Sequence, residues 1–150
     1  MKTKTYFNFL EPSLHTYLNL LLFQKTQHLV QISSRRNEKG YFLYGTVPYD
    51  NMMNFIFEKI QKTIGKKLNL LRVYSNLQFP GMDGDFHTDD GELTCMIMIH
   101  GDGDFEIKNE KRFSFVENSL IIFDASKSHK GHAPSKDYRI TLAFKTREII

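Results

Sequence analysis

Two segments in the first half of the chain carry apolar residues at helical spacing. The first begins at Glu11-Pro-Ser-Leu14 and is expected to end near Phe23, with leucines recurring along it (Leu14, Leu18, Leu21 and Leu22). In the second, Asp50 is expected to cap the start and Gly65 to take the left-handed position at the end, around one apolar stripe (Met53, Phe57, Ile60 and Ile64). Both patterns predict helices that bury one face against a core.

Short apolar runs separated by turn residues make up most of the remaining sequence. A short strand is expected over 6–10, and strands over 28–33 and 40–45 are expected to form a hairpin around the polar turn 35–40. From Leu68 onward the runs follow one another closely (70–74, 94–99, 105–107, 112–116, 119–123 and 138–144). Strands of this length and spacing are typical of sandwiches and barrels. The sequence predicts a mainly β (α+β) fold, a jelly roll or double-stranded β-helix with two helices outside one sheet.

Composition and charge limit the number of domains, the binding partners and the cellular compartment that we expect. The 150 residues, 41% of them hydrophobic, suit one domain over 1–150. A net charge of +3 permits nucleic-acid binding without indicating it. Cys95 lies in an apolar run and is predicted to be a buried thiol, which suits a reducing compartment. Because the sequence shows neither a signal-peptide pattern nor an apolar run of about 20 residues, we expect a cytoplasmic protein without a membrane partner.

A histidine and two acids stand close together in the segment DFHTDDG, residues 85–91. If the segment is extended, His87 and Asp89 face one way and Thr88 the other, so two ligands can reach one ion, while Asp90 belongs to the turn at Gly91. Two protein ligands hold a catalytic metal poorly, so another histidine is needed. The segment SHKGHAP, directly after the strand over 119–123, offers two candidates (His129 and His132). Two imidazoles and one carboxylate form the facial triad that is typical of non-haem Fe(II) oxygenases.

The last strand carries polar and apolar side chains in strict alternation. Between Tyr138 and Lys145 one face is apolar, and the other carries a different set (Arg139, Thr141, Ala143 and Lys145). This second face lies either in solvent, on an edge strand, or in an enclosed pocket. In a pocket, the planar guanidinium of Arg139 can take a carboxylate through two hydrogen bonds, with the hydroxyl of Thr141 beside it.

Three motifs in this order carry a family resemblance: FHTD, SHKG and YRITLAFK, with Arg139 ten residues after His129. Together, over about 70–145, they resemble the His-x-Asp…His…Arg-x-Ser/Thr pattern of the 2-oxoglutarate and Fe(II)-dependent dioxygenases. Within that superfamily the stretches HKGHAP and FVENSLIIFDA are most similar to small prolyl 4-hydroxylase-like domains. Asn118 stands where those domains usually have a turn glycine, and asparagine tolerates the left-handed conformation well.

The resemblance implies a role for particular residues. It implies Fe(II) bound by one triad of ligands (His87, Asp89 and His129), with His129 favoured over His132 by its spacing to Arg139. It implies further that 2-oxoglutarate is bound through its C5 carboxylate by Arg139, with help from Thr141. Tyr74 matches a tyrosine that often contacts this cosubstrate, although it precedes His87 by thirteen residues rather than fewer. Residues 77–84, with one proline and two glycines, are expected to form a flap over the iron.

The implied activity is hydroxylation of a C–H bond, with consumption of O2 and release of succinate and CO2 from 2-oxoglutarate. The expected primary substrate is a prolyl or other peptide, or a small molecule, in preference to nucleic acid. One alternative is oxidative demethylation of alkylated nucleic acid, because YRITLAFK also resembles the end of those demethylases, with Lys145 in the place of a second arginine. No long base-recognition insertion precedes His87, which argues against it. A second alternative is a non-catalytic jelly-roll binding module.

Overall fold

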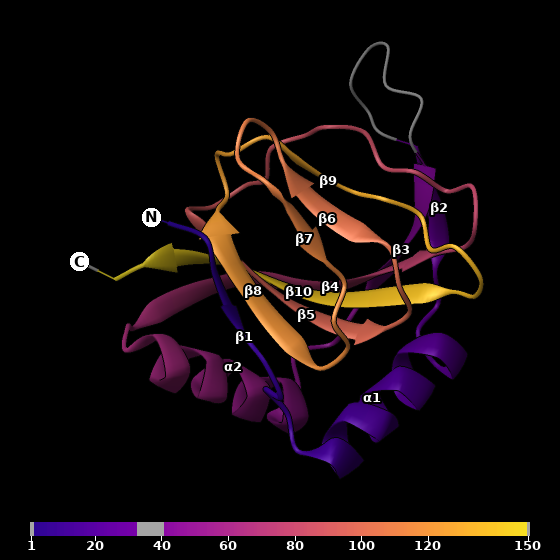
Figure 1. Ribbon diagram of the computed structural model, residues 1–150. Helices are drawn as coiled ribbons and strands as arrows, with labels where there is room; N and C mark the ends of the chain where they lie inside the picture. The colour runs from indigo at the N-terminus through magenta and orange to yellow at the C-terminus, as the bar shows by residue number, and fades with distance from the viewer. Residues whose placement is uncertain (1, 33–40, 150) are drawn as a thin grey trace.

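Two antiparallel sheets and two helices make up the computed structural model, which describes residues 2–32 and 41–149 (Figure 1). In chain order the elements are β1 (Lys4–Tyr6), α1 (Pro12–Gln24), β2 (Leu29–Ile32), β3 (Tyr41–Thr46), α2 (Asn51–Ile64), β4 (Leu68–Gln78), β5 (Leu93–His100), β6 (Asp104–Ile107), β7 (Arg112–Ser114), β8 (Ser119–Asp124), β9 (His129–Gly131) and β10 (Arg139–Glu148). The large sheet has the order β1-β8-β5-β10-β4-β3-β2, and the small sheet has the order β7-β6-β9.

The central strands of the large sheet, β5, β8 and β10, bury both of their faces, against different partners. On one face, β10 packs Ile140, Leu142 and Phe144 against the two helices, which lie together on that side of the large sheet (Figure 1). On the other face, Met96 and Phe123 pack against aromatic residues of the small sheet, such as Phe105. The predicted jelly roll with two helices outside one sheet is confirmed. The polar face of β10 therefore points into the space between the two sheets.

Both helices follow their sequence patterns. In α2 the side chain of Asp50 accepts a hydrogen bond from the backbone N–H of Met53 at 2.9 Å, and Gly65 has a φ of 68°. Helix α1 begins with Pro12 and ends at Gln24, one residue beyond the predicted end. No helix in 2–32 or 41–149 combines the length and apolar character needed to cross a membrane. The cap predictions are confirmed on both ends of α2.

The N-terminal strand differs from its prediction. Strand β1 covers Lys4–Tyr6, rather than 6–10, because Asn8 takes a φ of 50° and turns the chain out of the sheet. The following residues pack into the core, and the side chain of Asn118 holds them: it accepts from the N–H of Leu10 and donates to its carbonyl, each at 2.8 Å. Asn118 has the left-handed conformation that its place in the sequence predicts, with a φ of 59°.

The predicted hairpin and the predicted flap are only partly as expected. Strands β2 and β3 pair antiparallel as the hairpin predicts, while its turn over 35–40 falls outside the described residues. The flap predicted over 77–84 is shorter, because Leu77 and Gln78 continue the alternation of β4 and belong to that strand. The rest of the segment is tied down: Gly84 donates its N–H to the carbonyl of Gly131 at 3.0 Å, and Asp83 accepts from the N–H of Ala133 at 2.8 Å.

Cys95 has the environment that its apolar neighbours predict. It is fully buried on the helix-facing side of β5. Burial raises the pKa of its thiol to about 12, so it stays protonated at neutral pH. The prediction of a buried thiol is confirmed.

Candidate functional site

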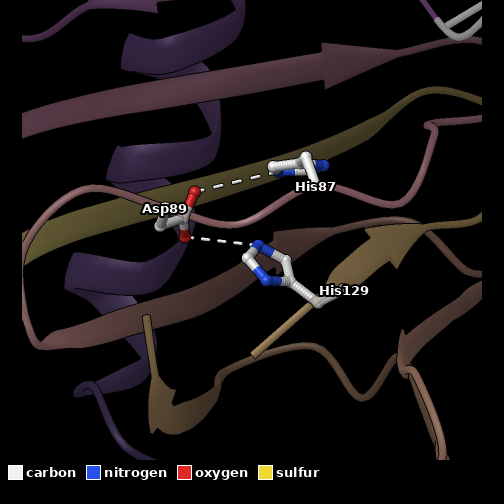
Figure 2. Close-up of side chains that lie close together, drawn as sticks. All are labelled: His87, Asp89 and His129. Atoms are coloured by element: carbon white, nitrogen blue, oxygen red, sulfur yellow. Dashed lines mark ion pairs between the residues drawn. The ribbon is translucent and has the colours of Figure 1, made fainter. Parts of the chain in front are cut away.

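Three side chains from two segments of the chain meet between the two sheets. The carboxylate of Asp89 lies between the imidazoles of His87 and His129, and one ligand atom from each residue lies within 4.8 Å of the others (Figure 2). Asp89 Oδ1 is 3.8 Å from His87 Nε2, and Asp89 Oδ2 is 3.2 Å from His129 Nε2. We call these residues the metal group. Their residue types and their separation fit a single divalent cation with open coordination positions.

Backbone pairing fixes how the metal group comes together. His87 and His129 of β9 form an isolated antiparallel bridge, with N–H to carbonyl distances of 2.9 and 2.8 Å. The N–H of Asp89 donates to the carbonyl of Ala125, just after β8, at 2.9 Å. The segment 85–91 is therefore tied to the ends of two strands but has no regular strand structure of its own. Within this segment, only His87 forms a β-bridge.

Each histidine of the metal group has its tautomer set by a backbone carbonyl. His87 Nδ1 lies 2.8 Å from the carbonyl oxygen of Asp85, and His129 Nδ1 lies 2.8 Å from that of Lys127. A carbonyl can only accept, so Nδ1 carries the hydrogen and Nε2 keeps its lone pair toward Asp89. Burial lowers the pKa of His129 to about 4, which keeps this ring neutral. Both histidines therefore keep an Nε2 lone pair that a metal ion can use.

A cavity of about 470 Å³ opens over the metal group. Its wall includes all three residues expected to contact a cosubstrate (Arg139, Thr141 and Tyr74). Strand β10 lies in the middle of the large sheet, between β5 and β4, rather than at an edge. The alternative of an exposed face for Arg139 and Thr141 is therefore wrong, and their face lines an enclosed pocket. The volume is within the usual range of about 300–1,000 Å³ for small-molecule sites.

Arg139 is a buried cation without a carboxylate partner in the described parts of the chain. Only 4% of its surface is exposed, and its Nη1 donates to the carbonyl oxygens of Asp104, at 3.1 Å, and His132. Its guanidinium lies over the ring of Phe115, and its Nε is buried without a hydrogen-bond partner among the described residues. Burial lowers the pKa of Arg139 to about 10, so it is still charged at neutral pH. An anion in the cavity would supply the missing acceptor.

Thr141 and Tyr74 extend the same wall toward the metal group. Thr141 is buried and lies opposite Asn76 of β4 across the strand pair. Tyr74 is buried between two groups: its ring stacks on Tyr44 with centroids 5.2 Å apart, and the guanidinium of Arg72 lies 5.0 Å from it. Burial raises the pKa of the Tyr74 hydroxyl, so it stays protonated at neutral pH. Tyr74 thus borders the cavity in spite of its unusual distance from His87 along the chain.

The neighbours of the metal group have roles that the pattern of alternation does not predict. Asp90 pairs with Arg72 at 2.6 Å, instead of capping the Gly91 turn. Thr88, expected to face away, also borders the cavity, because 85–91 is not a strand with alternating faces. His132 lies outside the metal group: its ring pairs with Glu106 at 2.7 Å. Its backbone carbonyl, rather than its imidazole, contributes to the site by holding Arg139.

Three further residues of the site have roles that the sequence patterns do not report. Gln78 lines the cavity opposite Arg139 on the neighbouring strand, and extending the alternation of β4 from Tyr74 would have found it. Gly131 leaves room for the guanidinium, because a methyl group at its Cα would overlap Arg139 Nη2. Lys145 is fully buried and contacts Asp89. Alternation places Lys145 on the correct face of β10, but nothing in the sequence reports its depth or its partner.

The sequence matches no model of a known protein family and no curated protein. Solved structures nevertheless share the fold at low identity. A viral collagen prolyl hydroxylase from Paramecium Bursaria Chlorella virus-1 gives a TM-score of 0.75 at 12% identity, over 100% of this chain and 91% of that chain. HygX from Streptomyces hygroscopicus, with nickel and 2-oxoglutarate bound, gives 0.73 at 6% identity, over 95% and 81%.

An oxidoreductase of the 2OG-Fe(II) oxygenase family from Burkholderia pseudomallei gives a TM-score of 0.71 at 10% identity, over 96% of this chain and 84% of that chain. All three similarities extend over nearly the whole of this chain, helices and both sheets included. They agree with the resemblance that the three sequence motifs carry. This chain therefore has the fold of the 2-oxoglutarate and Fe(II)-dependent oxygenases.

Proposed function

We propose that this protein is a 2-oxoglutarate and Fe(II)-dependent oxygenase that hydroxylates a C–H bond. One observation carries the proposal: the metal group and the unpaired, buried Arg139 line the same cavity. A binding module of the same fold needs neither a triad with open coordination positions nor a buried cation beside it. The two features together match what a metal-chelating dicarboxylic acid requires.

Each residue of the site would have a defined task. His87, Asp89 and His129 would hold Fe(II) through Nε2 atoms and a carboxylate oxygen. When bound, Fe(II), 2-oxoglutarate and O2 together would supply the oxidising chemistry: one oxygen atom of O2 enters succinate as 2-oxoglutarate loses CO2, and the other enters the hydroxylated product. Arg139, held in place by two backbone carbonyls, would bind the far carboxylate of 2-oxoglutarate, with the Thr141 hydroxyl beside it. The protein then fixes the direction in which the cosubstrate reaches the metal.

The apolar wall of the cavity would exclude water from the reacting atoms. The ring of His129 packs against the rings of Phe123, at 4.6 Å between centroids, and Phe105, at 5.5 Å. Met96 of β5 borders the same cavity. A dry site strengthens the electrostatic hold of Arg139 on a carboxylate and limits side reactions of the activated oxidant. Met96, Phe105 and Phe123 would contribute through packing alone, without taking part in the reaction.

For the primary substrate we propose a prolyl peptide. The viral protein that shares the fold over the whole chain is a collagen prolyl hydroxylase, which supports this choice. Half-buried aromatic side chains on β3, Phe42 and Tyr44, border the cavity and offer flat apolar faces to a ring-bearing substrate. Methylated oligonucleotides belong in the same screen, because turnover of those, and not of prolyl peptides, would identify the demethylase alternative.

Succinate release tests the proposal. Purified protein with Fe(II), ascorbate, 2-oxoglutarate and O2 should form succinate, and Asp89→Ala should reduce the rate at least about 100-fold because the metal loses its only carboxylate ligand. Asp137→Ala is the matched control, since it removes an exposed acid outside the cavity and should leave the rate unchanged. Equal succinate release by Asp89→Ala would refute the iron assignment. No release with any substrate of the screen would favour the binding module.

A further inference from the structure

A buried lysine lies against the carboxylate of the metal group. Lys145 has no exposed surface, and its side chain reaches from β10 into the space between the sheets. Its Nζ forms an ion pair with Asp89 Oδ2 and donates a hydrogen bond to Thr94 Oγ1 at 2.9 Å. Burying a lysine is costly unless it is paired and hydrogen-bonded, so this arrangement needs a structural or functional reason.

The two oxygens of Asp89 have different surroundings. Thr94 donates its hydroxyl hydrogen to Oδ2 at 2.8 Å, and Lys145 forms its ion pair with the same atom. Both contacts therefore engage Oδ2 rather than Oδ1. Oδ1 accepts no hydrogen bond from residues 2–32 or 41–149, and its nearest partner is His87 Nε2 at 3.8 Å. Oδ1 is thus the carboxylate atom that is free for a metal ion.

We propose that Lys145 is a positioning residue which, together with Thr94, restricts Asp89 to coordinating the metal through Oδ1 alone. The inference rests on the proposed function for the presence of the metal. A carboxylate that coordinates through both oxygens takes up one more position on the ion. Lys145 thereby keeps open a position that a chelating cosubstrate needs.

Substitution of Lys145 should have opposite effects on the two ligands. In Lys145→Met, Oδ2 loses a donor and becomes available to the metal, so metal affinity should rise or stay equal. The extra metal–oxygen contact should compete with cosubstrate, so 2-oxoglutarate should bind about tenfold or more weakly, the usual size of effects from groups that orient metal ligands. General damage to the site would instead weaken both. Lys145→Arg retains a donor and should restore behaviour close to that of the wild type.

Co(II) is a suitable probe, because its visible absorption reports coordination number without turnover. The test measures the Co(II) spectrum and Kd of each protein without cosubstrate, and then the Kd of 2-oxoglutarate for the Co(II)-loaded form. Lys145→Met should change the spectrum before any 2-oxoglutarate is added. Thr94→Val, which preserves the volume of a buried side chain and removes the other donor, should shift the spectrum in the same direction. It also carries the test if Lys145→Met does not fold, as judged by circular dichroism.

The outcomes separate this inference from the proposed function. An unchanged Co(II) spectrum with weaker 2-oxoglutarate binding would mean that Lys145 contacts the cosubstrate directly, and would overturn the inference. Loss of Co(II) binding in Lys145→Met or Thr94→Val would also overturn it, since the donors would then be building the metal group rather than restricting it. If the wild type binds no Co(II), the proposed function fails and the inference falls with it.

Discussion

Backbone carbonyls, more than side-chain pairs, prepare the individual residues of this site. The carbonyls of Asp85 and Lys127 set the tautomers of the two histidines, and those of Asp104 and His132 hold the Arg139 guanidinium. A carbonyl accepts hydrogen bonds without adding a formal charge. It therefore fixes a ligand in place and leaves its charge or lone pair for what binds in the cavity.

Substitution of Gly131 should weaken the binding of 2-oxoglutarate and leave the affinity for the metal unchanged. In Gly131→Ala the new methyl group overlaps Arg139 Nη2, so the guanidinium must leave its position. Loss of a charge-assisted pair of about 1.5–3 kcal/mol should raise the Kd of 2-oxoglutarate about 10- to 100-fold, with Mn(II) affinity unchanged. Equilibrium dialysis of both ligands measures this. Lys130→Ala is the control on the same strand, because its ammonium lies over the Phe86 ring outside the cavity. Equal affinities in both variants would show that Arg139 does not bind the cosubstrate.

At the scale of elements, the helices stabilise the sheet from the side opposite the site. Helix α2 buries Met53, Ile56 and Ile60 against the large sheet, and Phe57 stacks on Phe144 of β10 with centroids 5.9 Å apart. The next residues along β10, in both directions, point into the cavity side. Packing on one face of β10 thus holds the polar face in register with the metal group.

The cap of α2 should contribute to stability without affecting the site. Asp50→Ala removes the hydrogen bond to the Met53 N–H and should lower the free energy of unfolding by about 1 kcal/mol. Urea denaturation followed by circular dichroism gives this value. Asn51→Ala, at the next, exposed position, should change it little. A loss in succinate release under native conditions by Asp50→Ala would contradict the separation of helix and site.

Helices and strands could be predicted from the sequence where the spacing of apolar residues alone determines them. The prediction failed where contacts with distant parts of the chain determine the structure. The periodicity of α2 and the alternation of β10 were sufficient, since both elements bury a face. Strand β9 was not predicted, because its three residues contain only polar or glycine side chains and depend on β6 for pairing. Likewise, alternation predicted that Asp89 and His87 lie on one side, although the segment is held by single hydrogen bonds rather than a ladder.

At the scale of the whole molecule, the site joins parts of the chain that are far apart. The metal group comes from the segment after β4 and from β9, and the cavity wall with Arg139, Thr141 and Tyr74 comes from β4 and β10. Sequence spacing and the family resemblance selected the triad and Arg139. They could not reveal Lys145, Gln78 or Gly131, whose roles depend on burial and on contacts across strands. The topology of the sheet supplies that information.

Because ligands join these distant parts, they should stabilise the entire fold. At concentrations near 100 times its Kd, a ligand that binds only the folded state adds about 2.7 kcal/mol, which for a domain of this size raises Tm by about 5–10 °C. Thermal unfolding with Mn(II) and 2-oxoglutarate together should show such a shift in the wild type. Asp89→Ala should lose the metal-dependent part. An equal shift in that variant would place the Mn(II) ion elsewhere.

The position of a bound metal tests the central claim most directly. In a crystal of the wild type with Mn(II) and 2-oxoglutarate, we expect one anomalous peak within about 2.0–2.3 Å of His87 Nε2, His129 Nε2 and Asp89 Oδ1. We also expect the far carboxylate of 2-oxoglutarate to contact the Arg139 guanidinium. A metal peak away from these three atoms, or 2-oxoglutarate bound without contact to Arg139, would contradict it.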